Sequence, residues 1–251
     1  MPALPAVFTT TPIAHRGLHG DGIPENSLAA ARAAIEAGYG IEIDIQPALD
    51  GTPMVFHDYD LSRLAGDGSF IRTLSVQELS TRRLAGGSET IPELAALLDL
   101  VAGQVPLLIE IKDPDGRLGD NIGDLHDRVA QTLKGYEGPV AVMSFNPHVA
   151  KAFGAVMPEI PVGLTTCGFA EKDWAGVPQE VRERLAAIAD FDDAGACFVS
   201  HDRSDLTNPR IDALKAQGVP ILCWTIRSQD QEDQARRIAD NITFEGYQAK
   251  T

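Results

Sequence analysis

The sequence predicts an α/β protein: a closed (β/α)8 barrel of eight parallel strands with a helix after each strand. Short apolar runs rich in valine and isoleucine alternate with longer helical segments through 251 residues. This alternation is typical of a parallel sheet with crossover helices. About eight such units in ~250 residues fit a closed barrel better than an open sheet. The alternative is an open doubly wound sheet, whose nucleotide-binding versions lack support because neither GxGxxG nor GxxxxGK[ST] occurs.

The expected elements follow from composition and periodicity. Apolar runs expected to form strands lie at 12–15, 41–45, 54–57, 106–112, 140–145, 161–165, 197–200, 219–225 and 241–244. Segments of helical character lie at 28–37, 91–101, 125–133, 148–156, 180–189, 209–217 and 229–239. In the first helix, Asn26 or Ser27 is expected to cap the N-terminus, and Gly38 is expected to end the helix.

One region interrupts the alternation. Between His57 and Ile91 the connection contains Asp67-Gly68, Gly86-Gly87 and a short helical candidate at 76–84. It is too long for a simple link between a strand and a helix. We therefore interpret residues 1–251 as a single domain with a small insertion, approximately 58–90, after the second strand region.

Composition excludes several classes of protein. Hydrophobic residues make up 44% of the chain and charged residues 23%, an ordinary balance for a globular domain with a sizeable core. The net charge of −15 argues against a nucleic-acid partner and against docking on an anionic membrane. No run of about 18 apolar residues occurs, so stable membrane insertion is not expected.

The three cysteines, Cys167, Cys197 and Cys223, are widely spaced and form no CxxC pair. This pattern indicates neither a disulfide framework nor a thiolate zinc site, and it favours a reducing compartment. The first residues lack the basic segment and apolar run of a signal peptide. We therefore expect a cytoplasmic protein.

Carboxylates interrupt two of the apolar strands. Side chains alternate along a strand, so Glu42 and Asp44 share one face, and Glu110 and Lys112 share a face of a later strand. Three inward carboxylates beside one lysine leave excess negative charge, which a hard divalent cation would neutralise. Magnesium and calcium both fit better than zinc, because carboxylates outnumber imidazoles. An internal ion pair with arginine or lysine is the alternative.

Two histidines stand at the ends of predicted strands, His15 in the first and His57 in the run 54–57. Active sites of such barrels lie at the carboxyl ends of the strands, where imidazoles suit general acid and base roles. Arg16 and Lys112 are suited to bind a phosphate group. Together these residues indicate a site for a phosphate ester.

The ordered motifs resemble those of the glycerophosphodiester phosphodiesterase family. They are His15-Arg16-Gly17, Pro24-Glu25-Asn26-Ser27, Glu42-x-Asp44, His57-Asp58 and Glu110-x-Lys112, with Trp224-Thr225 in a late strand. The resemblance implies a TIM barrel that hydrolyses a small-molecule glycerophosphodiester to sn-glycerol 3-phosphate and an alcohol. It implies one divalent cation, Mg²⁺ or Ca²⁺, bound by Glu42, Asp44 and Glu110. It also implies His15 and His57 as the acid/base pair, with Arg16 and Lys112 on the phosphate and Trp224 as a candidate contact for the substrate.

Some alternatives stay open at this point. A lysophospholipase D, or a phosphodiester lyase that releases a cyclic phosphate, would use the same residues. The family's usual Thr-Asp pair after the last strand is replaced by Thr243-Phe244, with Glu245 as a candidate substitute. His201-Asp202 follow another strand end without an assigned role. The sequence does not predict the leaving alcohol, the choice of cation, which histidine is the acid, or the oligomeric state.

Overall fold

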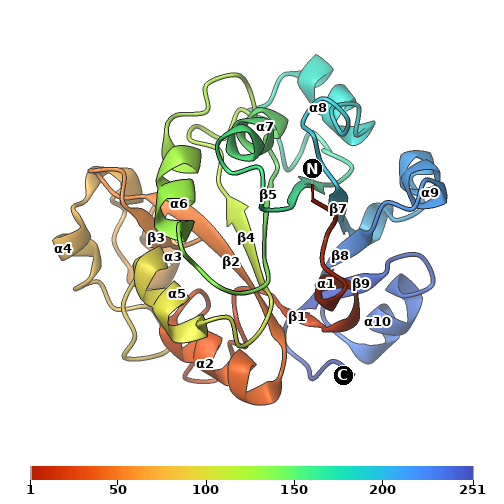
Figure 1. Cartoon of the computed structure of the whole chain (residues 1–251). Helices are drawn as coiled ribbons and strands as arrows, with labels where there is room; N and C mark the ends of the chain where they lie inside the picture. The colour runs from red at the N-terminus through yellow and green to blue at the C-terminus, as the bar shows by residue number, and fades with distance from the viewer. Residues whose placement is uncertain (1, 251) are drawn as a thin grey trace.

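The computed structural model describes residues 2–250. Within this range, eight parallel strands close into a barrel that helices surround, which confirms the predicted fold class (Figure 1). β1 pairs with both β2 and β9, and these pairings close the sheet. The barrel strands are β1 (Ile13–Ala14), β2 (Gly40–Pro47), β4 (Leu107–Ile111), β5 (Val140–Ser144), β6 (Val162–Thr166), β7 (Phe198–Asp202), β8 (Ile221–Ile226) and β9 (Asn241–Phe244).

The outer helices lie close to their predicted positions. They are α2 (Leu28–Ala37), α5 (Leu94–Val101), α6 (Leu125–Leu133), α7 (Pro147–Val156), α8 (Gln179–Ala186), α9 (Pro209–Ala216) and α10 (Gln229–Ala235). α8 ends before the predicted residue 189, because Ile188 takes a left-handed conformation with φ of 49°. A short helix, α1 (Val7–Thr10), places Phe8 in an apolar cluster with Ile13, Leu108 and Phe198. The described residues contain no helix both long and apolar enough to cross a membrane.

The start of α2 distinguishes the two candidate caps. Ser27 caps the helix, because its side chain accepts a hydrogen bond from the backbone N–H of Ala30. Asn26 instead donates from Nδ2 to Asp44 Oδ2 at 2.9 Å. Gly38 ends the helix in the left-handed conformation, as predicted.

The run at 54–57 corrects one expectation, because it is not a barrel strand. β3 (Pro53–Val55) pairs antiparallel with the end of β2, in register Ile45 with Val55. β2 extends past the barrel rim and the chain folds back on it. The backbone N–H of Phe56 then donates to the carbonyl of Asp44 at 2.9 Å. The hairpin therefore carries His57 back to the level of the carboxylates on β2.

The segment 58–90 contains α3 (Ser62–Ala65), η1 (Ile71–Thr73) and α4 (Val76–Leu79). α4 is shorter than the predicted 76–84, and a capping box between Ser75 and Glu78 marks its start. The segment packs around a separate apolar cluster that it shares with residues just before and after it, including Phe56, Leu61, Leu79 and Ile91.

A glycine in the barrel wall gives a test of packing. A Cβ at Gly163 on β6 would lie 2.4 Å from the ring of Phe198, whereas one at Gly154 in α7 would lie 3.5 Å from Val162. We expect Gly163→Ala to lower the free energy of unfolding by about 1–3 kcal/mol. Gly154→Ala is the matched control and should raise it by about 0.5–1 kcal/mol, because alanine favours helix. Urea unfolding measures both, and equal shifts in one direction would contradict the packing argument.

Candidate active site

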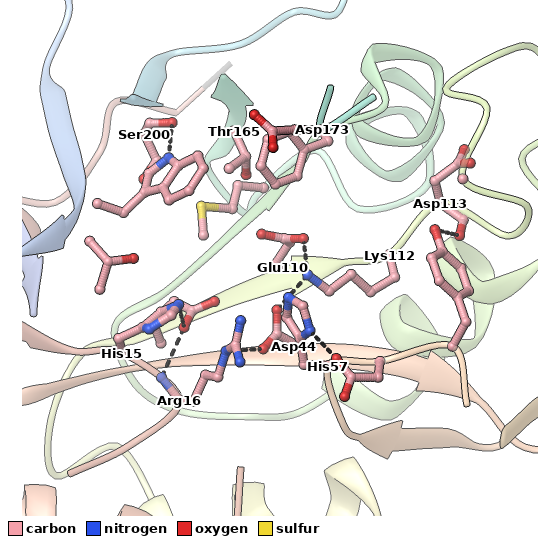
Figure 2. A pocket seen from close by; sticks show the side chains of 18 of the residues that line it. His15, Arg16, Asp44, His57, Glu110, Lys112, Asp113, Thr165, Asp173 and Ser200 are labelled. Atoms are coloured by element: carbon pink, nitrogen blue, oxygen red, sulfur yellow. Dashed lines mark hydrogen bonds and ion pairs between the residues drawn. The ribbon is translucent and has the colours of Figure 1, made fainter. Parts of the chain in front are cut away.

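A cavity of about 810 Å³ lies at the carboxyl ends of the barrel strands (Figure 2). Every site residue predicted from the sequence lines it, from β2, β4, β8 and the loops that follow β1, β3 and β4. These residues are His15, Arg16, Glu42, Asp44, His57, Glu110, Lys112 and Trp224. Residues far apart in the sequence are thus brought into one chamber.

The carboxylates of Glu42, Asp44 and Glu110 form a compact buried cluster. Asp44 on β2 and Glu110 on β4 are directly paired in the parallel register. One oxygen from each of the three carboxylates lies within 4.8 Å of the others. Burial raises the pKa of Glu42 well above its usual range, and the nearby charges of Asp44 and Glu110 raise it further. An all-oxygen cluster with this excess of negative charge fits a hard divalent cation.

Two cations partly neutralise the cluster. Lys112 Nζ lies 2.7 Å from Asp44 Oδ1 and 2.5 Å from Glu110 Oε1, and Arg16 Nε lies 3.2 Å from Asp44 Oδ2. Burial would raise the pKa of Asp44, but the positive charge of Lys112 and the smaller effects of His57 and Arg16 hold this pKa well below its usual range. Glu42 accepts a hydrogen bond from the backbone N–H of Arg16 at 3.0 Å, and among the described residues no lysine or arginine side chain pairs with it, whereas His15 Nε2 lies 3.9 Å away. The internal ion pairs therefore satisfy Asp44 and Glu110 but not Glu42.

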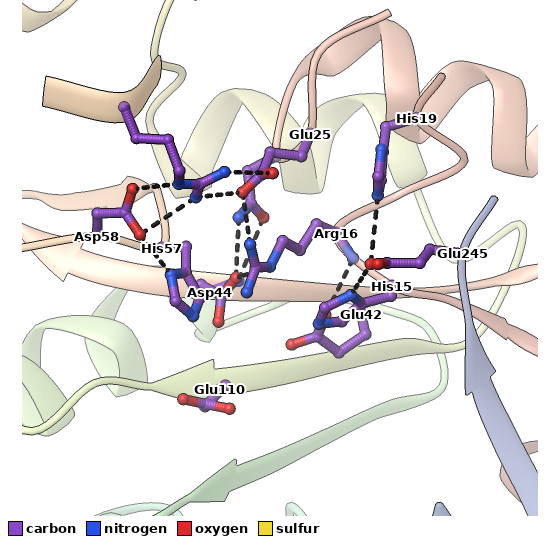
Figure 3. A network of polar contacts seen from close by, with 12 residues as sticks. His15, Arg16, His19, Glu25, Glu42, Asp44, His57, Asp58, Glu110 and Glu245 are labelled. Atoms are coloured by element: carbon purple, nitrogen blue, oxygen red, sulfur yellow. Dashed lines mark hydrogen bonds and ion pairs between the residues drawn. The ribbon is translucent and has the colours of Figure 1, made fainter. Parts of the chain in front are cut away.

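Each of the two histidines is held by a carboxylate at Nδ1 (Figure 3). His15 Nδ1 lies 2.5 Å from Glu245 Oε2, and His57 Nδ1 lies 2.7 Å from Asp58 Oδ1. Burial would raise the pKa of Glu245, but the hydrogen bond from His15 and the nearby imidazole of His19 hold it far below its usual range. The ionised carboxylate only accepts, so Nδ1 of His15 donates. Nε2 is then the ring atom left for chemistry in the cavity.

The carboxylate on His57 belongs to a larger network. Arg63, from the segment 58–90, donates from Nε to Asp58 Oδ2 at 2.7 Å and from its terminal nitrogens to Glu25 at 2.8 Å. Glu25 also accepts from Arg16 Nη1 at 2.6 Å. The segment 58–90 therefore orients both a histidine and a phosphate-binding candidate.

The carboxylate of Asp58 gives a second test. Burial would raise its pKa, but hydrogen bonds from His57 and Arg63 hold it far below its usual range, so it is ionised and accepts from His57. We expect Asp58→Asn to lower kcat by about ten- to a hundredfold, because the charge that orients the ring is lost. Asp60→Asn is the matched control, since Asp60 also lines the cavity but accepts only from Ser62. Equal losses in steady-state assays of the two variants would contradict this role.

The side of the cavity opposite the hairpin is aromatic. Trp224 Nε1 donates to the carbonyl of Ser200 at 3.0 Å, which fixes the indole. The ring of Phe145 lies 5.6 Å from that of Trp224 and 5.1 Å from that of Trp174, between centroids. The predicted Trp224 thus belongs to a group of rings, and the sequence analysis had not identified Trp174 as a member.

Three hydroxyl groups line the cavity without a hydrogen-bond partner among the described residues. They belong to Thr165 on β6, Ser200 on β7 and Thr243 on β9, and all three side chains are buried. Buried hydroxyls normally have partners. These groups are therefore suited to bind a polar ligand, and the sequence analysis did not select them.

Other histidines lie outside the cavity lining. His201 is fully buried, with Nδ1 2.7 Å from the hydroxyl of Thr166 and Nε2 3.0 Å from the carbonyl of Asp205. Both ring nitrogens are thus used within the fold. His126 and His148 lie on α6 and α7. His19 lies beside Glu245, with Nε2 3.7 Å from Oε2.

Comparison with known proteins agrees with this geometry. A family model described as the glycerophosphoryl diester phosphodiesterase family matches residues 15–241. A glycerophosphodiester phosphodiesterase from Caldanaerobacter subterraneus is 26% identical over 246 residues, which cover 93% of each chain.

Solved structures share the barrel. A phosphodiesterase from Oleispira antarctica, in complex with the product sn-glycerol-3-phosphate, superposes with a TM-score of 0.75 at 25% identity, over 95% of this chain and 94% of that one. A glycerophosphodiester phosphodiesterase from Thermotoga maritima has a TM-score of 0.71 at 22% identity, over 93% and 94% of the two chains. The second likeness supports the fold alone.

Proposed function

The chain belongs to the glycerophosphoryl diester phosphodiesterase family and is a phosphoric diester hydrolase, and we propose that it hydrolyses soluble glycerophosphodiesters to sn-glycerol 3-phosphate and an alcohol. The observation that carries this proposal is the single cavity that holds three clustered carboxylates, two oriented histidines and two cations. The cysteine pattern favours the cytoplasm as the place of this reaction.

We infer that Glu42, Asp44 and Glu110 bind one divalent cation, Mg²⁺ or Ca²⁺. The support is the oxygen-only donor set, its compactness and the fact that no lysine or arginine of the described residues pairs with Glu42. When bound, the ion supplies positive charge that stabilises charge developing on the phosphoryl oxygens. Lys112 lies in the same cluster. Its positive charge offsets part of the negative charge of the three carboxylates, so the net charge around the ion and the phosphate together is modest.

The chain's own residues divide the remaining work. Arg16 and Lys112 hold the phosphoryl oxygens by charge-assisted hydrogen bonds. One of His15 and His57 removes a proton from the attacking oxygen at Nε2, and the other donates a proton to the oxygen of the leaving alcohol. Glu245 and Asp58 hold the opposite ring nitrogens and so keep each Nε2 directed at the reaction.

Two groups of residues in the cavity, unpartnered hydroxyls and aromatic rings, suggest different partners in the substrate. The unpartnered hydroxyls of Thr165, Ser200 and Thr243 are suited to the hydroxyl groups of the glycerol. The aromatic side, with Trp224 and Trp174, is suited to the less polar surface of the leaving alcohol. We interpret the segment 58–90 as an insertion that shapes the entrance, because its Arg63 lines the cavity.

The aromatic side also supports one alternative activity on the same residues. Phe145, Trp174 and Val177 form an apolar surface that an acyl chain could contact, as in a lysophospholipase D. A phosphodiester lyase is the other form of the reaction, in which a hydroxyl of the substrate attacks phosphorus and a cyclic phosphate is released. Both use the same two histidines.

A phosphorus NMR time course tests the proposal. The purified protein is incubated with glycerophosphocholine or glycerophosphoethanolamine, with Mg²⁺, with Ca²⁺ or with a chelator. We expect glycerol 3-phosphate to appear only with a divalent cation. A persistent cyclic phosphate would indicate the lyase. An unchanged diester with both cations would reject these substrates, and lysophospholipids would be tested next.

A second arm of the same experiment tests the hydroxyl groups. Diesters of ethanolamine in which an alkyl group replaces glycerol should react at least about tenfold more slowly than glycerophosphoethanolamine, because Ser200 and its neighbours then face no polar group. Equal kcat/KM values for the two diesters would contradict the assignment of the glycerol to these hydroxyl groups.

A further inference from the structure

His15, His19 and Glu245 converge behind the cavity, and we propose that they form a second metal site, which binds Zn²⁺. One ring nitrogen of each histidine and a carboxylate oxygen of Glu245 lie within 4.8 Å of one another, and Glu245 Oε2 faces both His15 Nδ1 and His19 Nε2 (Figure 3). His15 begins the loop after β1, His19 lies further along that loop, and Glu245 follows β9. The β1–β9 pairing that closes the barrel therefore assembles the site.

Hydrogen bonding does not account for His19. Its Nε2 is shielded from solvent, has no hydrogen-bond partner among the described residues, and lies 3.7 Å from Glu245 Oε2. That distance is too long for a hydrogen bond. Two ligand atoms at about 2.0–2.1 Å from a tetrahedral zinc are separated by roughly 3.4 Å. The spacing of His19 and Glu245 is thus close to that of two ligands sharing one ion.

The contact between His15 and Glu245 is shorter, at 2.5 Å, and holds a proton rather than an ion. Zinc would replace that proton on Nδ1, and the two ligand atoms would have to separate by roughly 1 Å. Glu245 follows the end of β9 and lies in a loop. This adjustment therefore needs only movement of a side chain at a loop position.

The ligand chemistry separates this site from the carboxylate cluster. Two imidazoles and one carboxylate are a donor set that zinc uses with water as the fourth ligand, whereas oxygen-only sets select Mg²⁺ or Ca²⁺. The cation that pairs with Glu245 is Arg227, whose Nε lies 2.7 Å from the other oxygen of this carboxylate, and Arg16 lies next to His15. Arg227 is more than half exposed, so solvent screens its charge.

The site lies close to the surface. The side chains of His15, His19 and Glu245 are 14%, 23% and 19% exposed, so an ion reaches the shielded Nε2 of His19 after a small movement of these side chains. His19 and Glu245 do not line the substrate cavity. When zinc occupies Nδ1, His15 cannot carry protons on both ring nitrogens. Zinc should therefore inhibit hydrolysis. This inhibition rests on the proposed function, whereas zinc binding does not.

Competition with a chromogenic zinc indicator tests binding directly. Millimolar Mg²⁺ is included so that the carboxylate cluster is occupied. We expect one equivalent of zinc per chain with micromolar affinity, and at least about tenfold weaker binding for His19→Gln. His148→Gln, which changes an exposed histidine on α7, is the matched control and should bind as the unchanged chain does.

Two further measurements make each outcome decisive. Zinc should shift the imidazole nitrogen signals of His15 and His19 in ¹⁵N NMR spectra, and a cooperative thermal unfolding transition of His19→Gln is expected as the check that this variant folds. Zinc binding that is absent, unaffected by His19→Gln, or removed by Glu110→Gln overturns the proposal. Hydrolysis is measured separately in Mg²⁺ alone, so failure of the zinc site and failure of the proposed function are distinguished.

Discussion

Replacing Glu42 by glutamine is expected to lower kcat for glycerophosphodiesters by about a thousandfold or more. Glutamine keeps the shape of the side chain but removes the charge that a divalent cation needs. Glu42 is also the carboxylate of the cluster with which no lysine or arginine of the described residues pairs, and burial raises its pKa well above the usual range. The charged form therefore destabilises the metal-free fold, and its removal should stabilise that fold.

Two measurements separate these effects. In chelator, Glu42→Gln should unfold at a higher temperature than the unchanged chain, and added Mg²⁺ or Ca²⁺ should stabilise only the unchanged chain. Glu36→Gln, at an exposed position on α2, is the matched control and should change neither activity nor metal response. A Glu42→Gln variant with full, metal-independent activity would overturn the role of Glu42 as a ligand.

The fold was largely predictable because strand and helix periods differ. The run at 54–57 shows where the spacing of apolar residues is insufficient on its own. This spacing reveals an extended segment but not whether the segment pairs parallel or antiparallel. The necessary signal was present in the spacing. The connection at 48–52 is shorter than the dozen or so residues that a parallel crossover needs, so only an antiparallel hairpin was possible.

Whether a site residue could be predicted from the sequence depended on the chemical type of its side chain. Carboxylates on a buried strand are unusual, so Glu42 and Asp44 stood out from the sequence. Glu245 stood out less, because it reaches His15 only through the closure of β9 against β1. Ser200 and Thr243 gave no signal, since hydroxyl residues are ordinary in strands, and only their lack of partners in a cavity marks them.

Replacing either histidine of the pair should nearly abolish hydrolysis of glycerophosphocholine. We expect His15→Asn and His57→Asn each to lower kcat by about 10²- to 10⁴-fold, because asparagine fills similar space but transfers no proton. His126→Asn, on α6 and outside the cavity lining, is the control for loss of an imidazole. Retained activity in either site variant would remove that residue from the mechanism.

The leaving alcohol then decides which histidine is the acid. A phenol of low pKa departs without protonation, so a glycerophosphodiester with such a leaving group no longer needs a general acid. The variant that lacks the acid should recover most of its rate with this substrate, and the variant that lacks the base should not. Rescue of both variants, or of neither, would contradict a division of acid and base between His15 and His57. Since Glu245 and Asp58 hold the two rings in equivalent ways, the difference must come from where each Nε2 meets the substrate.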